Sequence, residues 1–197
     1  MLPFIADMPP MLQERVVCSI VAAVKYEIPA NLMLAVAEKE GGKPGQWVRN
    51  TNGTHDIGPM QFNTVYLQDL AKYGITSDDV AASGCYSYDL AAWRIRMHIR
   101  NDKGDLWTKA ANYHSRTPRY NSVYRADLID KAVKWADWLE AHLSAQDLTQ
   151  MTQLTATSPA QAPQAVTQPT TAANSYRPNE YVPRSITFSS SAQVSTQ

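Results

Sequence analysis

Apolar residues recur at helical spacing in the first 146 residues, and this periodicity limits the possible fold more than any other feature. Val17, Ile20, Val21 and Val24 stand at i, i+3, i+4 and i+7, which is the spacing of one helix face. Later stretches repeat the pattern, and no segment alternates between apolar and polar residues over the length of a strand. We therefore predict a single all-α domain of about six helices over residues 1–146.

Residues that break helices set the expected limits of the first elements. A helix should cover about residues 10–27, and a short, mostly apolar helix, "LMLAVAEKE", should end at Gly41 and Gly42. Residues 43–56 are rich in Gly, Asn and Pro, which predicts a loop. A further helix should then cover about residues 59–72.

The composition changes sharply near residue 146. Residues 147–197 contain no Gly, Lys, Trp, Cys or His and consist largely of Thr, Ser, Gln, Ala and Pro. Such a segment has too little apolar surface to offset the entropy lost on ordering, so we predict a disordered tail. The stretch "SYRPNEYVPRSITF" within it carries aromatic residues and arginines. It is either a docking peptide or unstructured like its surroundings.

The overall charge and hydropathy exclude several classes of partner. The chain has 18 Lys and Arg against 18 Asp and Glu, so its net charge does not indicate nucleic acid or an anionic membrane. No apolar run reaches the length of a membrane span. The first ten residues lack a basic residue and contain Asp7, Pro9 and Pro10, which is unlike a signal peptide. A removed leader, a trimmed start and another export route all remain open.

Cofactor and metal chemistry find no support in the sequence. The four histidines, at positions 55, 98, 114 and 142, form no HExxH or comparable metal signature. The chain also has no G-x-S-x-G element and no phosphate-binding glycine loop. We therefore expect a protein that uses neither a metal nor an organic cofactor.

The stretch "AEKEGGKPG", residues 37–45, places two glutamates beside a glycine pair at the end of a nearly apolar helix. Glu38 and Glu40 are two residues apart, so their side chains should point in different directions. Burial of one carboxyl at the rim of a cleft would raise its pKa and leave a proton available near neutral pH. The other interpretation is that both belong to a solvated last turn, and this stretch alone does not decide.

The following segment, "NTNGTHDIGPMQFN" at residues 50–63, does decide. It resembles the SLT-type lytic transglycosylases, which have a goose-type lysozyme-like fold and a glutamate before a G-L-M-Q element. It looks most like the specialised transglycosylases of conjugation and type IV secretion systems, with N-x-N-G-S-x-D-I-G-L-M-Q-I-N. Two departures from the pattern matter: Pro59 replaces the usual Leu, and Gly41 replaces the usual Ser after the glutamate. With "AANYHSRTPRYNSVY", the resemblance covers about residues 16–140.

The resemblance implies a catalytic role for Glu40 rather than Glu38. Glu40 would protonate the oxygen of the β-1,4 bond between N-acetylmuramic acid and N-acetylglucosamine in peptidoglycan. The ionised Glu40 would then take the proton of the muramyl 6-hydroxyl, giving a 1,6-anhydro product without water. Asp56 keeps a hydrolytic, two-acid muramidase open, although we expect it to organise its loop by accepting backbone hydrogen bonds. A non-catalytic, glycan-binding assembly protein of the same fold is the third alternative.

Further residues match family positions that contact the glycan. Asn52 stands where much of the wider family has a sugar-contacting serine, and Asp56 lies in the same segment. For Met60 and the tyrosines, ordinary core packing is the competing interpretation. The positions at which the resemblance implies glycan contact are Asn52, Asp56, Met60, Gln61, Tyr113 and Tyr124.

The two cysteines, Cys18 and Cys85, lie in no CxxC element. On the residues alone, buried free thiols and a single disulfide are equally supported. Their placement, in the first helix and before a later one, is similar to the conjugation branch, which implies a disulfide. The resemblance also implies a periplasmic enzyme that opens the cell wall locally for a secretion or conjugation apparatus. Its expected partners are peptidoglycan strands and, through residues 147–197, components of that apparatus.

Removing residues 147–197 should leave the midpoint of thermal unfolding nearly unchanged, because the tail has almost no apolar surface to bury. Calorimetry of the full chain and of residues 1–146 measures this directly. If the tail docks onto a partner machine, the shortened protein keeps its activity in vitro while transfer or secretion by cells declines. A large fall in the midpoint would show instead that the tail packs on the domain.

Overall fold

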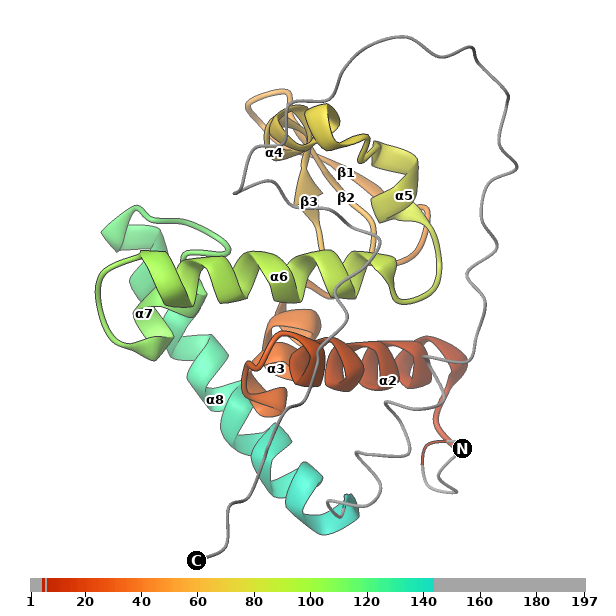
Figure 1. Ribbon diagram of the computed structural model, residues 1–197, viewed down its shortest axis with the longest axis vertical. Helices are drawn as coiled ribbons and strands as arrows, with labels where there is room; N and C mark the ends of the chain where they lie inside the picture. Colours follow the sequence, from red (N-terminus) through yellow and green to blue (C-terminus); the bar gives the residue numbers. More distant parts are fainter. Residues whose placement is uncertain (1–4, 6, 144–197) are drawn as a thin grey trace, which may run out of the picture. The chain divides into compact units, whose positions relative to one another are not determined.

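The computed structural model describes residue 5 and residues 7–143. The predicted tail at 147–197, and the end of the predicted domain, therefore lie outside the described residues. Within them, the expected helical domain is confirmed (Figure 1). The helices are α2 (Pro10–Lys25), α3 (Ala30–Glu40), α4 (Thr64–Leu70), the 3-10 helix η1 (Ala71–Tyr73), α5 (Ser77–Ala81), α6 (Tyr86–Asn101), α7 (Leu106–Ala111) and α8 (Pro118–His142). No helix in this part of the chain is long and apolar enough to cross a membrane.

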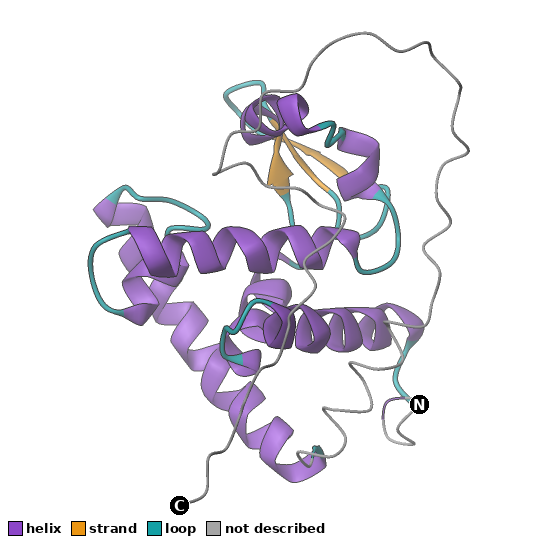
Figure 2. Ribbon diagram, in the orientation of Figure 1, coloured by secondary structure: helices purple, strands orange, loops and turns teal. Residues whose placement is uncertain are grey.

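A small antiparallel sheet is the main difference from the prediction (Figure 2). Its strands, in the order β1-β2-β3, are β1 (Trp47–Arg49), β2 (His55–Ile57) and β3 (Phe62–Asn63). The loop predicted over residues 43–56 is therefore wrong, because this segment contains β1 and most of β2. Strands of two or three residues are too short to produce a recognisable alternation.

The helix predicted over residues 59–72 begins later, at Thr64. Asn63 caps it, since the Asn63 side-chain oxygen accepts a hydrogen bond from the backbone N–H of Val65 at 3.0 Å. The preceding residues form a turn between β2 and β3 in which Gly58 and Gln61 have positive φ angles of 70° and 49°. Met60 and Gln61 consequently lie in a turn rather than on a helix.

Helix α2 confirms the first predicted helix, but its buried face differs from the predicted one. Val24 is 44% exposed, whereas Val16, Ile20 and Ala23 are fully buried. Helix α2 packs against both α3 and α6, so two neighbours cover a wider face than one apolar stripe provides. In Figure 1, α6 lies between two groups of elements. The sheet, α4 and α5 are on one side of it, and α2 and α3 are on the other.

Helix α3 lies at the centre of the helical part and packs against α2 and α8. All six residues from Leu32 to Ala37 have an exposed fraction of 0%, so the helix is enclosed all round over this length. It ends at Gly41, whose φ of 58° is left-handed and whose N–H donates to the Ala37 carbonyl at 3.2 Å. This termination leaves Glu40 as the last helical residue.

Cys18 of α2 and Cys85, directly before α6, form a disulfide. The bond confirms the pairing implied by the family resemblance and leaves no free cysteine among the described residues. It closes a sequence separation of 67 residues, which includes all of α3 and the sheet.

Replacing both Cys18 and Cys85 by alanine should destabilise the domain by about 4 kcal/mol in the chain-entropy description of disulfides. That change corresponds to a fall of roughly 10 °C in the unfolding midpoint, and calorimetry measures it. A reductant should lower the midpoint of the wild type and leave that of the double variant unchanged. Thiol titration of the unfolded, unreduced protein should find no free thiol. Two titratable thiols in protein from its native compartment would contradict the bond.

Candidate active site

The two glutamates at the end of α3 have different partners. The Tyr124 hydroxyl of α8 donates a hydrogen bond to Oε1 of Glu40 at 2.6 Å. Glu38 instead accepts a hydrogen bond from the indole N–H of Trp135 at 2.7 Å and pairs with Lys131 at 3.2 Å. The expected divergence of the two side chains is therefore confirmed.

The environment of Glu40 favours the neutral form of its carboxyl group. Burial raises the pKa of Glu40 from 4.5 to about 7. The hydrogen bond from Tyr124 opposes this rise, the charge of Asp56 adds to it, and the positive charges of Arg94 and Lys39 again oppose it. A large fraction of Glu40 is thus protonated near neutral pH, which is the state that a general acid requires.

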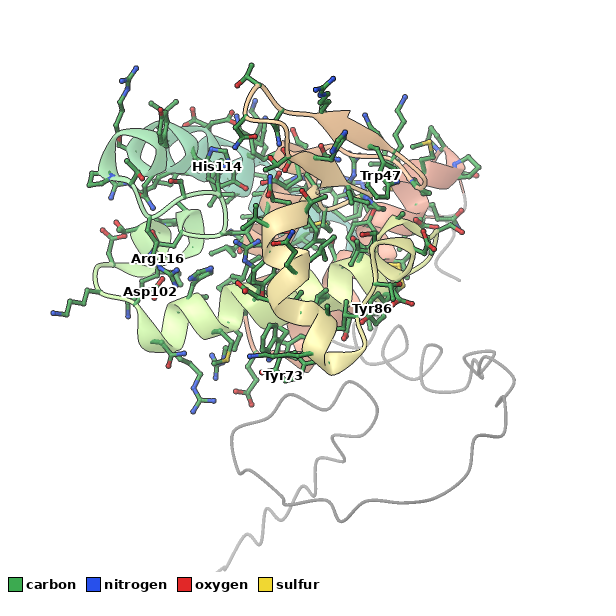
Figure 3. All side chains as sticks on the ribbon, turned by 90° about the horizontal axis from the view of Figure 1, so that it is seen from above. Trp47, Tyr73, Tyr86, Asp102, His114 and Arg116 are labelled. Atoms are coloured by element: carbon green, nitrogen blue, oxygen red, sulfur yellow. A yellow bond between two sulfur atoms is a disulfide. The ribbon has the colours of Figure 1, made fainter. Side chains whose placement is uncertain are left out.

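Glu40 opens into a pocket of about 460 Å³ between the end of α3 and the beginning of α8. The His114 ring stacks on the Tyr124 ring with their centroids 4.8 Å apart and their planes 5° apart; His114 is labelled in Figure 3. Tyr120 and Val123 bring apolar surface to the same pocket, with exposed fractions of 54% and 72%. The pocket thus combines the carboxyl group of Glu40 with aromatic and apolar walls and with two cations, Lys39 and Arg119.

Two glycines allow the turn between β2 and β3 to lie close to the residues after α3 on one side and to α5 on the other. A Cβ on Gly42 would lie 2.1 Å from the Gly58 carbonyl oxygen, and one on Gly58 would lie 2.0 Å from the Val80 carbonyl oxygen. Neither position therefore has room for a side chain. The Gln61 side-chain amide donates to the Gly58 carbonyl at 2.8 Å. Gln61 is thus placed against Gly42, two residues beyond Glu40, with its amide nitrogen bonded inside its own turn.

Met60 and Tyr113 support this turn from within the core. Met60 is fully buried and Tyr113 is 4% exposed, and the Tyr113 hydroxyl donates to the Met60 carbonyl at 2.7 Å. Burial raises the pKa of Tyr113 well above its usual value, and the charge of Glu40 adds to the rise. Both side chains are therefore part of the core, and neither lines the pocket.

Asn52 and Asp56 organise the sheet. The Asn52 side-chain oxygen accepts hydrogen bonds from the backbone N–H and the hydroxyl of Thr54, at 3.1 and 2.7 Å, in the exposed β1–β2 turn. Asp56 accepts a hydrogen bond from the Asn63 side-chain amide at 2.8 Å, whereas the sequence suggested backbone donors. Asp56 acts on Glu40 through its charge, and the described contacts of Asn52 stay within its own turn.

Arg94 of α6 is a site residue that the sequence did not indicate. Its guanidinium lies over the Tyr66 ring at 4.0 Å and over the Tyr113 ring at 4.7 Å, measured to the ring centroids. Its positive charge lowers the pKa of Glu40 against the effect of burial. Nothing in the sequence separates Arg94 from the neighbouring arginines of α6, such as Arg96. In the described residues, no group of three His, Cys, Asp or Glu side chains is placed to hold a metal ion.

Comparison with known proteins relates this geometry to a family. The family model described as "Transglycosylase SLT domain" matches residues 17–127. The invasion protein IagB of Salmonella typhimurium is 28% identical over 118 residues, which make up 59% of this chain and 71% of that protein. Protein IpgF of Shigella flexneri is 35% identical over 97 residues, or 49% of this chain and 63% of that protein. Because the family model matches more than half of the sequence and includes Glu40, this chain belongs to the transglycosylase SLT domain family.

Proposed function

We propose that this protein is a lytic transglycosylase that cleaves the β-1,4 bond between N-acetylmuramic acid and N-acetylglucosamine in peptidoglycan. The observation that carries the proposal is the partly buried Glu40, whose pKa is raised to about 7, in a pocket at the end of α3. Membership of the SLT family supports transglycosylase chemistry. Glu40 serves as the only acid and the only base.

The geometry suits two successive proton transfers by one carboxyl group. Tyr124 occupies Oε1 of Glu40, so the proton of the neutral acid is on Oε2, from which it passes to the glycosidic oxygen. The bond from the anomeric carbon to that oxygen breaks as positive charge develops on the sugar ring. The hydrogen bond from Tyr124 and the charges of Arg94 and Lys39 then stabilise the ionised Glu40.

The ionised Glu40 completes the reaction as a base. It takes the proton from the muramyl 6-hydroxyl while that oxygen attacks the anomeric carbon, which closes the 1,6-anhydro ring and restores the neutral acid. A hydrolytic muramidase would instead need a second carboxylate to activate water. Asp56 is engaged by the Asn63 side-chain amide, and this supports the reaction with one acid.

The biological setting follows from the sequence resemblance and from the relatives. The motif at residues 50–63 resembles that of transglycosylases from conjugation and type IV secretion systems, and one relative is named an invasion protein. The disulfide between Cys18 and Cys85 suits an oxidising compartment such as the periplasm. We therefore propose that the enzyme opens peptidoglycan locally for a secretion or conjugation apparatus, with residues 147–197 as the segment that contacts it.

Glu40→Gln should reduce the release of anhydro-muropeptides from purified sacculi by about 100- to 10,000-fold, since the amide can neither give nor reclaim the proton. Glu38→Gln is the matched control: the amide oxygen still accepts from Trp135, so its activity should stay within a few-fold of wild type. Mass spectrometry of the products separates anhydro from reducing ends. Reducing ends from the wild type would establish the muramidase, and inactivity on sacculi would indicate the non-catalytic module. Full activity of the Glu40 variant would contradict the mechanism.

The rate of cleavage should fall as the pH rises through about 7, because the first step needs the protonated form of Glu40. Tyr124→Phe removes a hydrogen bond that lowers the pKa of Glu40, so the alkaline limb of this profile should move to higher pH. Initial rates at saturating sacculi between pH 5 and 9 measure the alkaline limb of the wild type and of the variant. A limb that moves to lower pH in the Tyr124 variant would show that another group controls the profile.

A further inference from the structure

The first two turns of α8 separate two pockets. The face toward Glu40 contributes Tyr120, Val123 and Tyr124 to the pocket described above. The neighbouring face lines a second pocket, of about 520 Å³, which also contacts the end of α6 and helix α7. The residues on this second face have the helical spacing i, i+3, i+4 and i+7: Pro118, Asn121, Ser122 and Arg125.

The second pocket lies in a basic part of the chain. Residues 100–125 contain six Lys or Arg and two Asp, whereas the whole chain has 18 of each sign. Three of these cations, Lys103, Arg116 and Arg125, line the pocket, and Asp102 is the only acid that does so. The electrostatics of the pocket therefore favour a negatively charged ligand.

Asp102 cannot neutralise all three cations, because its carboxylate is already fully engaged. It accepts hydrogen bonds from the side chains of Asn112 at 2.8 Å and Arg116 at 3.2 Å, and it contacts Nδ1 of His98 at 2.7 Å. Partial burial works against ionisation, but the hydrogen bonds from Arg116, Asn112 and His98 lower the pKa of Asp102 to about 2. Figure 3 shows Asp102 and Arg116 side by side.

Two cations remain for a ligand. Lys103 is exposed and forms no hydrogen bond or ion pair with the described residues. Arg125 donates one hydrogen bond, to the Thr108 hydroxyl, and keeps its other guanidinium N–H groups. Asp105 also lies close enough to feel the charge of Arg125, but its Oδ1 caps α7 by accepting from the Thr108 N–H at 2.8 Å.

Hydrogen bonds hold two asparagine side chains that line the pocket. Asn121 is 5% exposed, and its side-chain amide donates to the Thr108 carbonyl at 3.0 Å and to the Asn112 side-chain oxygen at 2.8 Å. Asn112 in turn donates to Asp102. This chain of hydrogen bonds ties the end of α6, α7 and α8 together around the pocket, and the Arg125 side chain joins it through Thr108. Lys103 directly follows Asp102, a member of this network.

We propose that the second pocket binds the carboxylates of the peptide stem carried by a muramic acid residue in the Glu40 pocket. This inference rests on the proposed function, since the stem branches from the sugar that Glu40 would act on. A helix with its side chains is about 10–12 Å across, and four extended residues span up to about 14 Å. A stem that begins in the Glu40 pocket is therefore long enough to pass the N-terminal end of α8.

The binding test uses the free stem tetrapeptide L-Ala–γ-D-Glu–diaminopimelic acid–D-Ala and the full-length protein. The peptide should shift the side-chain amide signals of Asn112 and Asn121 in NMR spectra, and its carboxamide derivative should not. Lys103→Ala combined with Arg125→Gln should weaken binding by about tenfold or more, the loss expected for charge-assisted hydrogen bonds. Arg100→Ala, which removes an exposed cation outside this pocket, is the matched control and should bind like the wild type. Unchanged amide signals in the wild type would overturn the inference.

A cleavage test separates this inference from the proposed function. On glycan strands that carry stems, the Lys103 and Arg125 double variant should show a KM raised several-fold with kcat unchanged. On strands whose stems an amidase has removed, it should match the wild type. An equal loss on both substrates, or no loss on either, would overturn the pocket assignment. Peptide binding without anhydro products would refute the proposed function alone, and anhydro products without peptide binding would refute the pocket alone.

Discussion

The burial of α3 is the constraint on which the rest of the site depends. Its residues from Leu32 to Ala37 are fully buried, so the helix cannot rotate without exposing apolar surface or opening cavities in the core. The fixed orientation of α3 about its own axis thereby determines the direction in which Glu40 points. Ion pairs from Lys39 to Asp127 and from Lys131 to Glu38 add contacts between the last turn of α3 and α8, although such partly exposed pairs contribute little.

The same burial that makes Glu40 an acid also destabilises the fold at neutral pH. A rise in pKa from 4.5 to about 7 corresponds to a cost of roughly 3 kcal/mol for ionising Glu40 in the folded state. Tyr124, 84 residues away in sequence, limits this cost through its hydrogen bond, and Arg94 limits it through its charge. The site thus needs α6 and α8 in place, and the disulfide ties the start of α6 to α2.

The sequence predicted those features that depend on local pattern or on a family motif. The helical class, the end of α3 at Gly41, the divergence of Glu38 and Glu40 and the Cys18–Cys85 pair all follow from such signals. The sheet was missed because its strands are two or three residues long.

Features created by tertiary contact had no signal in the sequence. The Arg94 guanidinium lies over rings contributed by α4 and by the segment after α7. Asp102 joins His98 of α6 to Asn112 and Arg116 in the segment between α7 and α8. The close approach of Gly42 to Gly58 likewise brings together residues that only the fold makes neighbours. Such contacts have no characteristic spacing along the chain, so periodicity cannot reveal them.

The pH dependence of stability tests the central claim, the desolvated acid at Glu40, without reference to any substrate. The folded-state pKa is raised, so the stability that the neutral acid provides is present below about pH 4.5 and is lost as the pH rises through about 7. Glu40→Gln has no such loss. The unfolding free energies of the variant and the wild type should therefore be similar at pH 4, and the variant should be more stable by up to about 3 kcal/mol at pH 8. A difference that does not change between these two pH values would contradict the account.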